Sequence, residues 1–227
     1  MFIGHYALGF AAKPLAPQVS LGTLFLACQW ADLLWPTLVM AGVESFSIRP
    51  GITTVTPLEF EYYPYSHSLL ALFLWGVLLG LIYRVVMRAP WRSALVIGAL
   101  VVSHWVLDVI VHRPDLPLAP GSSSRLGFGL WNSVRLTLAI EFALYVAGAW
   151  LYLRTTVARD RIGSVGLWAL LVFLGVVEIA NVLGPPPPSV TAVTLSAQAM
   201  WLLVLWGYWI DRHREVTISG NTIGSIC

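Results

Sequence analysis

The chain has 227 residues, of which 58% are hydrophobic and only 11% charged. Soluble globular domains carry about a quarter charged residues, so this composition excludes an ordinary soluble protein and predicts an integral membrane protein. A net charge of +2 without a basic run argues against a nucleic-acid-binding protein, and two cysteines exclude a disulfide framework or a cysteine-rich metal site.

The predicted elements begin with a short N-terminal half-helix. Residues 2–12 are apolar and compatible with a helix, and "KPLAP" then interrupts the chain. Six windows follow that are long and apolar enough to cross about 30 Å of hydrocarbon. They lie near 20–42, 65–86, 93–111, 135–153, 165–183 and 195–210. We therefore expect an all-α integral membrane protein, with one transmembrane domain over 1–215 and a polar C-terminal tail over 216–227.

The basic residues divide unevenly between the two sets of loops. Nine lie at Lys13 and in 84–92, 154–164 and 211–215, and four lie in or beside the opposite loops. The positive-inside rule then predicts a multi-pass protein with both termini in the cytoplasm. The outer side carries two loops, at 43–64 and 112–134, which are longer than a connection needs and typical of functional loops.

Ionisable residues inside the predicted spans are the strongest functional signal. One charge at this depth costs at least about 3 kcal/mol, so such groups usually face the protein interior. They are Asp32, His104, Asp108, Glu141 and Glu178. His67 lies at the outer start of the second span, and His5 on the half-helix would reach the same layer. Apart from Arg84 and Arg135, near the ends of two spans, no Lys or Arg lies inside a predicted span, so the acids need protons, a metal ion or water.

The stretch "SHWVLDVIVH" at 103–112 places His104, Asp108 and His112 on one stripe of a helix, because four residues turn about 400°. A histidine and a carboxylate at this spacing can reach one ion, as two histidines do in helical zinc motifs. The mixture of imidazoles and carboxylates suits zinc first, with manganese or iron as alternatives. The expected ligands are His5, Asp32, His67, His104 and Asp108.

Further residues are expected beside these ligands, as hydrogen-bond partners or as contacts to a substrate. The serines flank two of the predicted histidine ligands, and the arginines lie where they can hold a lipid phosphate or anchor a head group. Either Asp32 or Asp108 can alternatively accept a proton from water. The further residues are Ser66, Ser103, His112, Arg113, Arg125, Glu141 and Glu178.

Four segments resemble the membrane-bound metal-dependent hydrolases of bacterial inner membranes, a family distantly similar to zinc-dependent phospholipase C. They are "GHYALGFAAK" (4–13), "LACQWADLLWP" (26–36), "YSHSLL" (65–70) and "VSHWVLDVIVHRPDLPL" (102–118). The resemblance covers about the first 120 residues. It implies a location in the bacterial inner membrane and the hydrolysis of phosphodiesters.

The five expected ligands fall on motif positions of that family. Three other ligand positions of the family carry different residues here, namely Leu34, Trp35 and Tyr62. The resemblance therefore implies the metal site with a smaller set of ligands.

We expect a membrane-embedded, metal-dependent hydrolase that faces outward and acts on a lipid or lipid-linked ester or phosphodiester, with membrane lipid as its partner. An ion with an open position would lower the pKa of bound water and polarise a phosphoryl or acyl oxygen. Two alternatives stay open. A proton- or cation-coupled transporter would show a continuous polar path to the cytoplasm. A non-catalytic membrane protein with a structural metal would show a closed site of four ligands.

Overall fold

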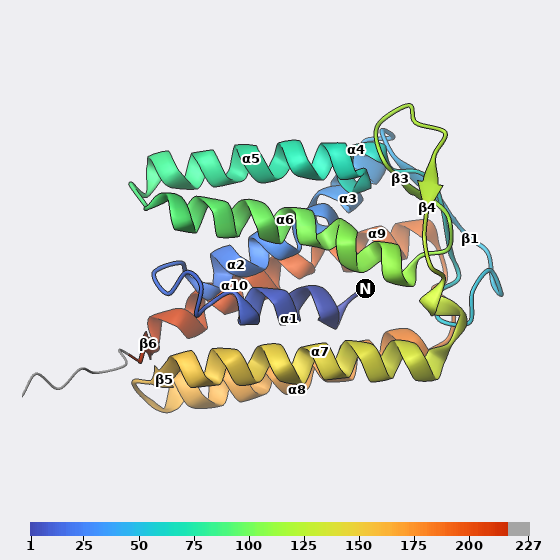
Figure 1. Ribbon diagram of the computed structural model, residues 1–227. Coiled ribbons are helices and arrows are strands. Elements are labelled where there is room, and N and C mark those ends of the chain that lie inside the picture. The colour runs from blue at the N-terminus through green and yellow to red at the C-terminus, as the bar shows by residue number, and fades with distance from the viewer. Residues whose placement is uncertain (218–227) are drawn as a thin grey trace, which may run out of the picture.

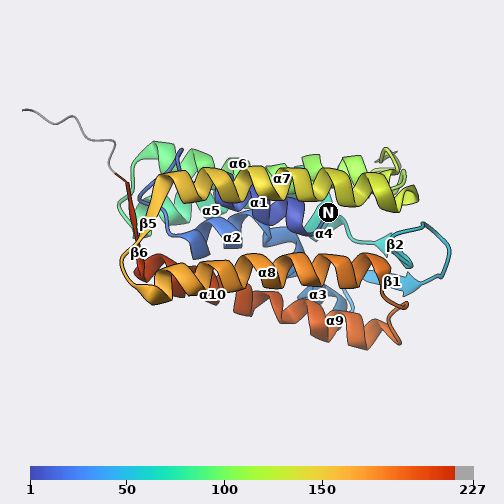
Figure 2. The same ribbon diagram turned by 90° about the horizontal axis from the view of Figure 1, so that it is seen from below.

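Within residues 1–217, which the computed structural model describes, five helical segments are long and apolar enough to span a membrane. They are α5 (Leu69–Val86), α6 (Trp91–Val111), α7 (Val134–Thr155), α8 (Arg161–Leu183) and the segment Val190–Arg212, which contains α9 (Val190–Gln198) and α10 (Met200–Arg212). A bent pair, α2 (Leu21–Cys28) and α3 (Trp30–Met40), makes a sixth candidate span. The long helices run side by side (Figures 1 and 2). The expected all-α membrane architecture is confirmed.

The first predicted span is not one straight helix, because its two halves meet at an angle of 58°. The break falls at Gln29, whose backbone leaves the helical region at φ −103° and ψ 7°. At this break the carbonyl of Cys28 accepts a hydrogen bond from the ring of His104. Irregular backbone at membrane depth is tolerated when protein groups satisfy it. The bend therefore connects this span to α6.

The last span is longer than its predicted range of 195–210. It begins at Val190, directly after Ser189, whose hydroxyl caps the helix by accepting from the backbone of Ala192. Polar residues lower the hydropathy of α9, but the hydroxyls of Thr194 and Ser196 bond to carbonyls of their own helix. The helix can therefore extend where average hydropathy indicates a loop.

The expected half-helix is confirmed as α1 (Ile3–Ala11), which is buried inside the bundle and packs along α7 and α2. Its close approach to α7 depends on Gly148, because a Cβ there would collide with the carbonyl of Ala7. Figure 1 shows α1 lying between the other helices, with the N-terminus inside the bundle. The helix thereby brings His5 to the buried layer, as expected.

Short sheets close the two ends of the bundle. At one end, β1 (Ser45–Ile48) pairs with β2 (Leu58–Tyr62), and β3 (Leu116–Pro117) pairs with β4 (Arg125–Leu126). The short helix α4 (Pro64–His67) and the 3-10 turn η1 (Leu130–Asn132) lie with them. At the other end, β5 (Thr156–Ala158) pairs with β6 (Arg214–Val216). Of the predicted polar tail, 218–227 lies outside the described residues.

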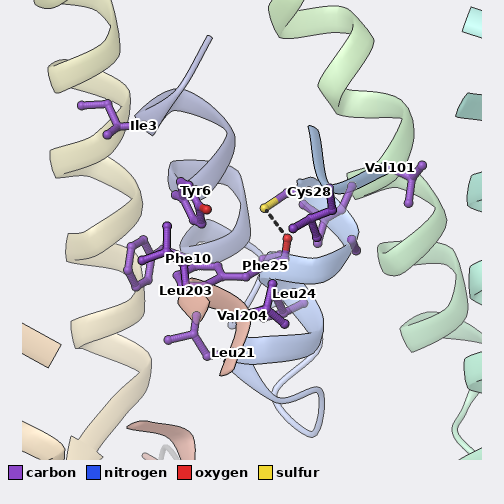
Figure 3. Close-up of a cluster of buried hydrophobic side chains, with 14 of the residues drawn as sticks. Ile3, Tyr6, Phe10, Leu21, Leu24, Phe25, Cys28, Val101, Leu203 and Val204 are labelled. Carbon is purple, nitrogen blue, oxygen red and sulfur yellow. Dashed lines mark hydrogen bonds between the residues drawn. The ribbon is translucent and has the colours of Figure 1, made fainter. Parts of the chain in front are cut away.

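The middle of the bundle is filled with buried apolar side chains (Figure 3). Tyr6 and Phe10 of α1 face Phe25 of α2, and their rings meet Phe25 edge to face at 4.9 Å and 5.0 Å. Leu203 and Val204 of α10 close this cluster from a further side.

Candidate metal centre

All five residues expected to be ligands come together at the end of the bundle that carries β1–β4. The half-helix α1 supplies His5, the bent helix α3 supplies Asp32, the short helix α4 supplies His67, and α6 supplies His104 and Asp108. Two overlapping triads can each offer atoms within 4.8 Å of one another: His5 with His104 and Asp108, and Asp32 with His67 and His104. A cluster that could hold a metal ion is thus present where the sequence predicts it.

Four separations between imidazole and carboxylate atoms connect the two triads. Nε2 of His104 lies 3.2 Å from Oδ2 of Asp108 and 3.7 Å from Oδ1 of Asp32. Nε2 of His67 lies 3.4 Å from Oδ1 of Asp32 and 4.0 Å from Oδ2 of Asp108. Bonds of about 2.0–2.1 Å to a tetrahedral zinc ion place neighbouring ligand atoms about 3.3–3.4 Å apart. The observed separations bracket that value and extend slightly above it.

The ring of His104 is oriented for binding through Nε2. Its Nδ1 lies 2.9 Å from the carbonyl oxygen of Cys28, which can only accept, so Nδ1 carries the proton. In the neutral ring the lone pair is then on Nε2, which is buried and has no hydrogen-bond partner among the described residues. A histidine that binds a metal through one ring nitrogen usually donates a hydrogen bond from the other.

Two hydrogen bonds also orient His67, and the chain that they form begins at Glu44. The hydroxyl of Ser66 donates to Oε2 of Glu44 at 2.5 Å, and its oxygen lies 2.7 Å from Nδ1 of His67. Since the hydroxyl proton goes to Glu44, the histidine donates from Nδ1 and keeps its lone pair on Nε2. Oε1 of Glu44 accepts from the backbone of Tyr65 and Ser66. Ser66 thus contacts both His67 and Glu44, and Glu44 is the residue that sequence reasoning missed.

His5 supports Asp108 from the opposite side. Its Nε2 lies 3.0 Å from Oδ1 of Asp108, and its ring stacks on that of His104 with centroids 3.6 Å apart. The amino group of Met1 donates to the same oxygen at 2.7 Å. The N-terminal amine is therefore a partner of the buried Asp108 in addition to the partners expected from the sequence.

His112, at the end of α6, also borders the cluster. Its Nε2 lies 4.0 Å from Oδ2 of Asp108, and its Nδ1 lies 2.9 Å from Oδ1 of Asp115. Burial disfavours the charged form of Asp115, but the partners His112 and Arg113 outweigh this effect and hold the pKa of its carboxyl below the ordinary value. Asp115 is the second residue that sequence reasoning missed, because only the turn after α6 brings it back to His112.

Two of the remaining expected neighbours contact residues that border the cluster. Arg113 pairs with Asp115 at 2.9 Å and with Glu59 of β2 at 3.3 Å. Arg125 donates to the backbone carbonyl of Asp115 at 3.2 Å. They therefore support the His112 side of the cluster.

The three other expected neighbours stand farther from the ligand atoms. Glu141 accepts from the backbone of Gly4 at 3.2 Å, which places it behind α1. The hydroxyl of Ser103 donates to Leu100 of its own helix at 2.7 Å. Glu178 is buried on α8, and no hydrogen bond between described side chains connects it to the ligands. The expected contacts of Ser103 and Glu178 with the cluster are thus not found in the described part of the chain.

The residues at the three unmatched family positions form no part of the polar cluster. The ring of Trp35 lies edge-on to His67 at 6.5 Å and packs on Phe46 and Phe60. The hydroxyl of Tyr62 bonds to that of Tyr65. Leu34 has no ligand atom. An apolar wall thus replaces potential ligands on this side.

The cluster has one accessible edge. The side chain of Asp32 is 25% exposed, whereas those of His67, His104 and Asp108 are 4% exposed or less. An apolar groove of about 330 Å³ runs beside α4 along the face of α5, with Tyr65 and Trp75 among its lining residues. The arrangement can hold an ion with a coordination position open toward Asp32.

A family model described as YdjM inner membrane protein matches residues 64–183, which is more than half of the chain. The match starts at α4 and ends with α8, so it contains three of the five candidate ligands. Its description agrees with the inner-membrane location that the resemblance implies, and it names no enzymatic activity. No curated protein and no solved structure matches the chain.

Proposed function

We propose that this chain, which belongs to the YdjM inner membrane protein family, is a membrane-embedded metal-dependent hydrolase. The observation that carries the proposal is the convergence of Asp32, His67, His104 and Asp108 at ligand spacing, with the Nδ1 atoms of both histidines already bonded to acceptors. We favour zinc, with manganese or iron as alternatives, because the donor set mixes imidazole and carboxylate and contains no thiolate.

The electrostatics of the cluster favour a cation. The carboxylates of Asp32 and Asp108 lie beside the Nε2 atoms of two imidazoles, in a buried region where an uncompensated charge costs free energy. A divalent ion would offset both negative charges, and the amine of Met1 approaches only Oδ1 of Asp108. Oδ2 of Asp108 and Oδ1 of Asp32 both face the imidazole lone pairs, so a cation between them would turn mutual repulsion into attraction.

The residues of the site have separable tasks in the proposed reaction. A bound ion would acidify a water molecule and polarise the oxygen of a phosphoryl or acyl group. Ser66 and the carbonyl of Cys28 hold the two histidine rings in position. Asp108 is enclosed, so it serves to hold the ion, whereas Asp32 stands at the accessible edge, where a substrate can contact it.

We further propose a lipid or lipid-linked ester or phosphodiester as the substrate. The accessible edge belongs to a site inside the helix bundle of a membrane protein, and the groove beside α4 is lined by apolar residues such as Leu70 and Leu74. Arg113 at the rim is 31% exposed and can approach a phosphate group, although it also pairs with acids. These features suit a substrate with an apolar body and an anionic head.

The two alternative functions receive less support. A transporter needs a polar path across the membrane, but the buried rings of Tyr6, Phe10 and Phe25 pack against one another between α1 and α2 (Figure 3). A purely structural metal needs a closed site, but Asp32 is partly exposed. The hydrolase therefore accounts best for both the ligand geometry and the accessible edge.

We propose that the site faces away from the cytoplasm. Nine basic residues lie at the end of the bundle with β5 and β6, and four lie at the end with the site. Cys28 is buried, so a membrane-impermeant thiol reagent can report on Cys227, which lies outside the described residues. Cys227 should be labelled only after permeabilisation of cells, and labelling in intact cells would reverse the orientation.

The hydrolase proposal is tested with protein purified without chelators and supplied with zinc. Metal content and hydrolysis of a soluble phosphodiester, an ester and a phospholipid are measured for the wild type and for His104→Gln. The variant should lose metal and activity together. His213→Gln, which alters an exposed histidine at the opposite end, should retain both. Folded wild-type protein that binds no metal would refute the metal site, and bound metal without any hydrolysis would favour the structural alternative.

A further inference from the structure

His112 is the cap residue directly after α6, and its ring lies near Asp108 of that helix. Its backbone N–H still bonds to the carbonyl of Asp108 at 2.8 Å, whereas its φ of −63° and ψ of 149° are extended. The side chain is 3% exposed. A buried polar ring at this point needs partners for both nitrogens, because an unpaired buried polar atom is costly.

One nitrogen of His112 has a firm partner. Nδ1 lies 2.9 Å from Oδ1 of Asp115, whose other oxygen accepts from Nε of Arg113 at 2.9 Å. The hydroxyl of Tyr63 donates to Asp115 as well, at 3.2 Å. A carboxylate held in this way accepts the Nδ1 proton, so the lone pair of the neutral ring is on Nε2.

The other nitrogen of His112, Nε2, lies near Asp108 in the metal cluster. Nε2 of His112 is 4.0 Å from Oδ2 of Asp108, the same separation as for Nε2 of His67. This is too long for a hydrogen bond. Two ligands of one ion can stand at most about 4.2 Å apart, which is twice the bond length. A separation of 4.0 Å is close to this limit, so Nε2 of His112 would shift toward Asp108 for both atoms to bind one cation, because Nε2 of His67 already lies at the same distance from Oδ2.

The surroundings of the ring favour this role over contact with bulk water. The ring centroid of Trp131 lies 4.3 Å from that of His112, and the centroid of Phe60 lies at 5.0 Å. These aromatic rings belong to the loops that cover the site, so they restrict access of solvent to the imidazole. Within the described part of the chain, its two nitrogens lie near Asp115 and Asp108.

We infer that His112 is a further ligand of the proposed metal ion, held in place by Asp115. The site would then offer the imidazoles of His67, His104 and His112 and the carboxylates of Asp32 and Asp108. Five protein ligands exceed the four of a closed tetrahedral zinc site, so this assignment predicts higher coordination. The inference rests on the proposed metal site but makes a separate claim about one residue.

Cobalt(II) is the probe, because its visible absorption bands change in position and intensity with coordination number. His112→Ala in purified protein should weaken cobalt binding at least about tenfold and alter these bands. Free imidazole should restore the wild-type spectrum by entering the space between Phe60 and Trp131. Asp115→Ala should weaken binding less than His112→Ala does. His213→Ala, with or without imidazole, should match the wild type.

The outcomes separate this inference from the proposed function. If the wild type binds cobalt and His112→Ala shows the same affinity and spectrum, His112 is no ligand but the metal site stands. If the folded wild type binds no cobalt, both fail. Should His112→Ala not fold, His112→Gln provides the same measurement with a side chain that fills more of the space. Unchanged binding and bands in that variant would equally overturn the inference.

Discussion

Replacing Asp108 by Asn separates metal binding from packing at the centre of the site. The amide keeps the size of the carboxylate and can still accept from His5 through one oxygen, but it carries no charge. Structural zinc sites with four ligands contribute about 10–16 kcal/mol, so one ligand accounts for roughly 2.5–4 kcal/mol if the ligands share this equally. Asp108→Asn should therefore weaken zinc affinity by about two to three orders of magnitude.

The assay for this prediction is competition with a chromophoric chelator, combined with thermal unfolding in the presence and absence of zinc. Zinc should raise the unfolding temperature of the wild type and leave that of Asp108→Asn nearly unchanged. Glu178→Gln is a matched control, because it makes the same chemical change at an equally buried acid of a span that lacks contact with the ligands. Wild-type zinc affinity in Asp108→Asn would show that Asp108 is not a ligand and refute the reasoning.

Three other predictions follow from single contacts. Ser66→Ala should weaken zinc affinity about 10–100-fold, because His67 loses its hydrogen-bond partner, whereas Ser66→Thr should retain affinity. If Ser66→Ala binds zinc as tightly as the wild type in the same competition assay, Ser66 does not orient His67. Gly148→Ala should lower the free energy of unfolding by about 1–3 kcal/mol, because its Cβ would collide with the carbonyl of Ala7. Gly175→Ala should lower it less, because its Cβ would meet only the ring of Phe142 at an ordinary contact distance. Denaturant titration of both variants measures the difference, and equal losses would contradict the prediction. Hydrogen bonds from the backbone of Gly163 and from His213 lower the pKa of Asp160, so its contribution to stability is present above its unfolded pKa of about 3.9 and is lost as the pH falls through the lower folded value. Asp160→Asn should flatten this acidic part of the stability curve, and an unchanged pH dependence below about pH 4 would contradict the assignment.

The helical spans could be predicted from the sequence because each depends on local composition. A stretch of about 20 apolar residues must satisfy its backbone internally to enter lipid, so hydropathy alone locates α5, α6, α7 and α8. The break at Gln29 has no such signal. Its residues are apolar on both sides, and the bend is observed where Cys28 meets His104, a residue far along the chain.

The same division applies to the site. His104 and Asp108 share a helix, so their spacing alone predicted that they face one point, and the helical period requires no knowledge of the fold. Glu44 and Asp115 show no such pattern in the sequence. Neither shares a helix with the histidine that it supports, and each reaches that region only through the course of a loop. The sequence by itself determined that charges within the apolar spans, such as those of Asp108 and Glu141, are buried, since apolar segments of this length enter the membrane. Only the tertiary structure decided which atoms orient the histidines and which edge stays accessible, because those contacts join α2, α4, α6 and the loops at close range.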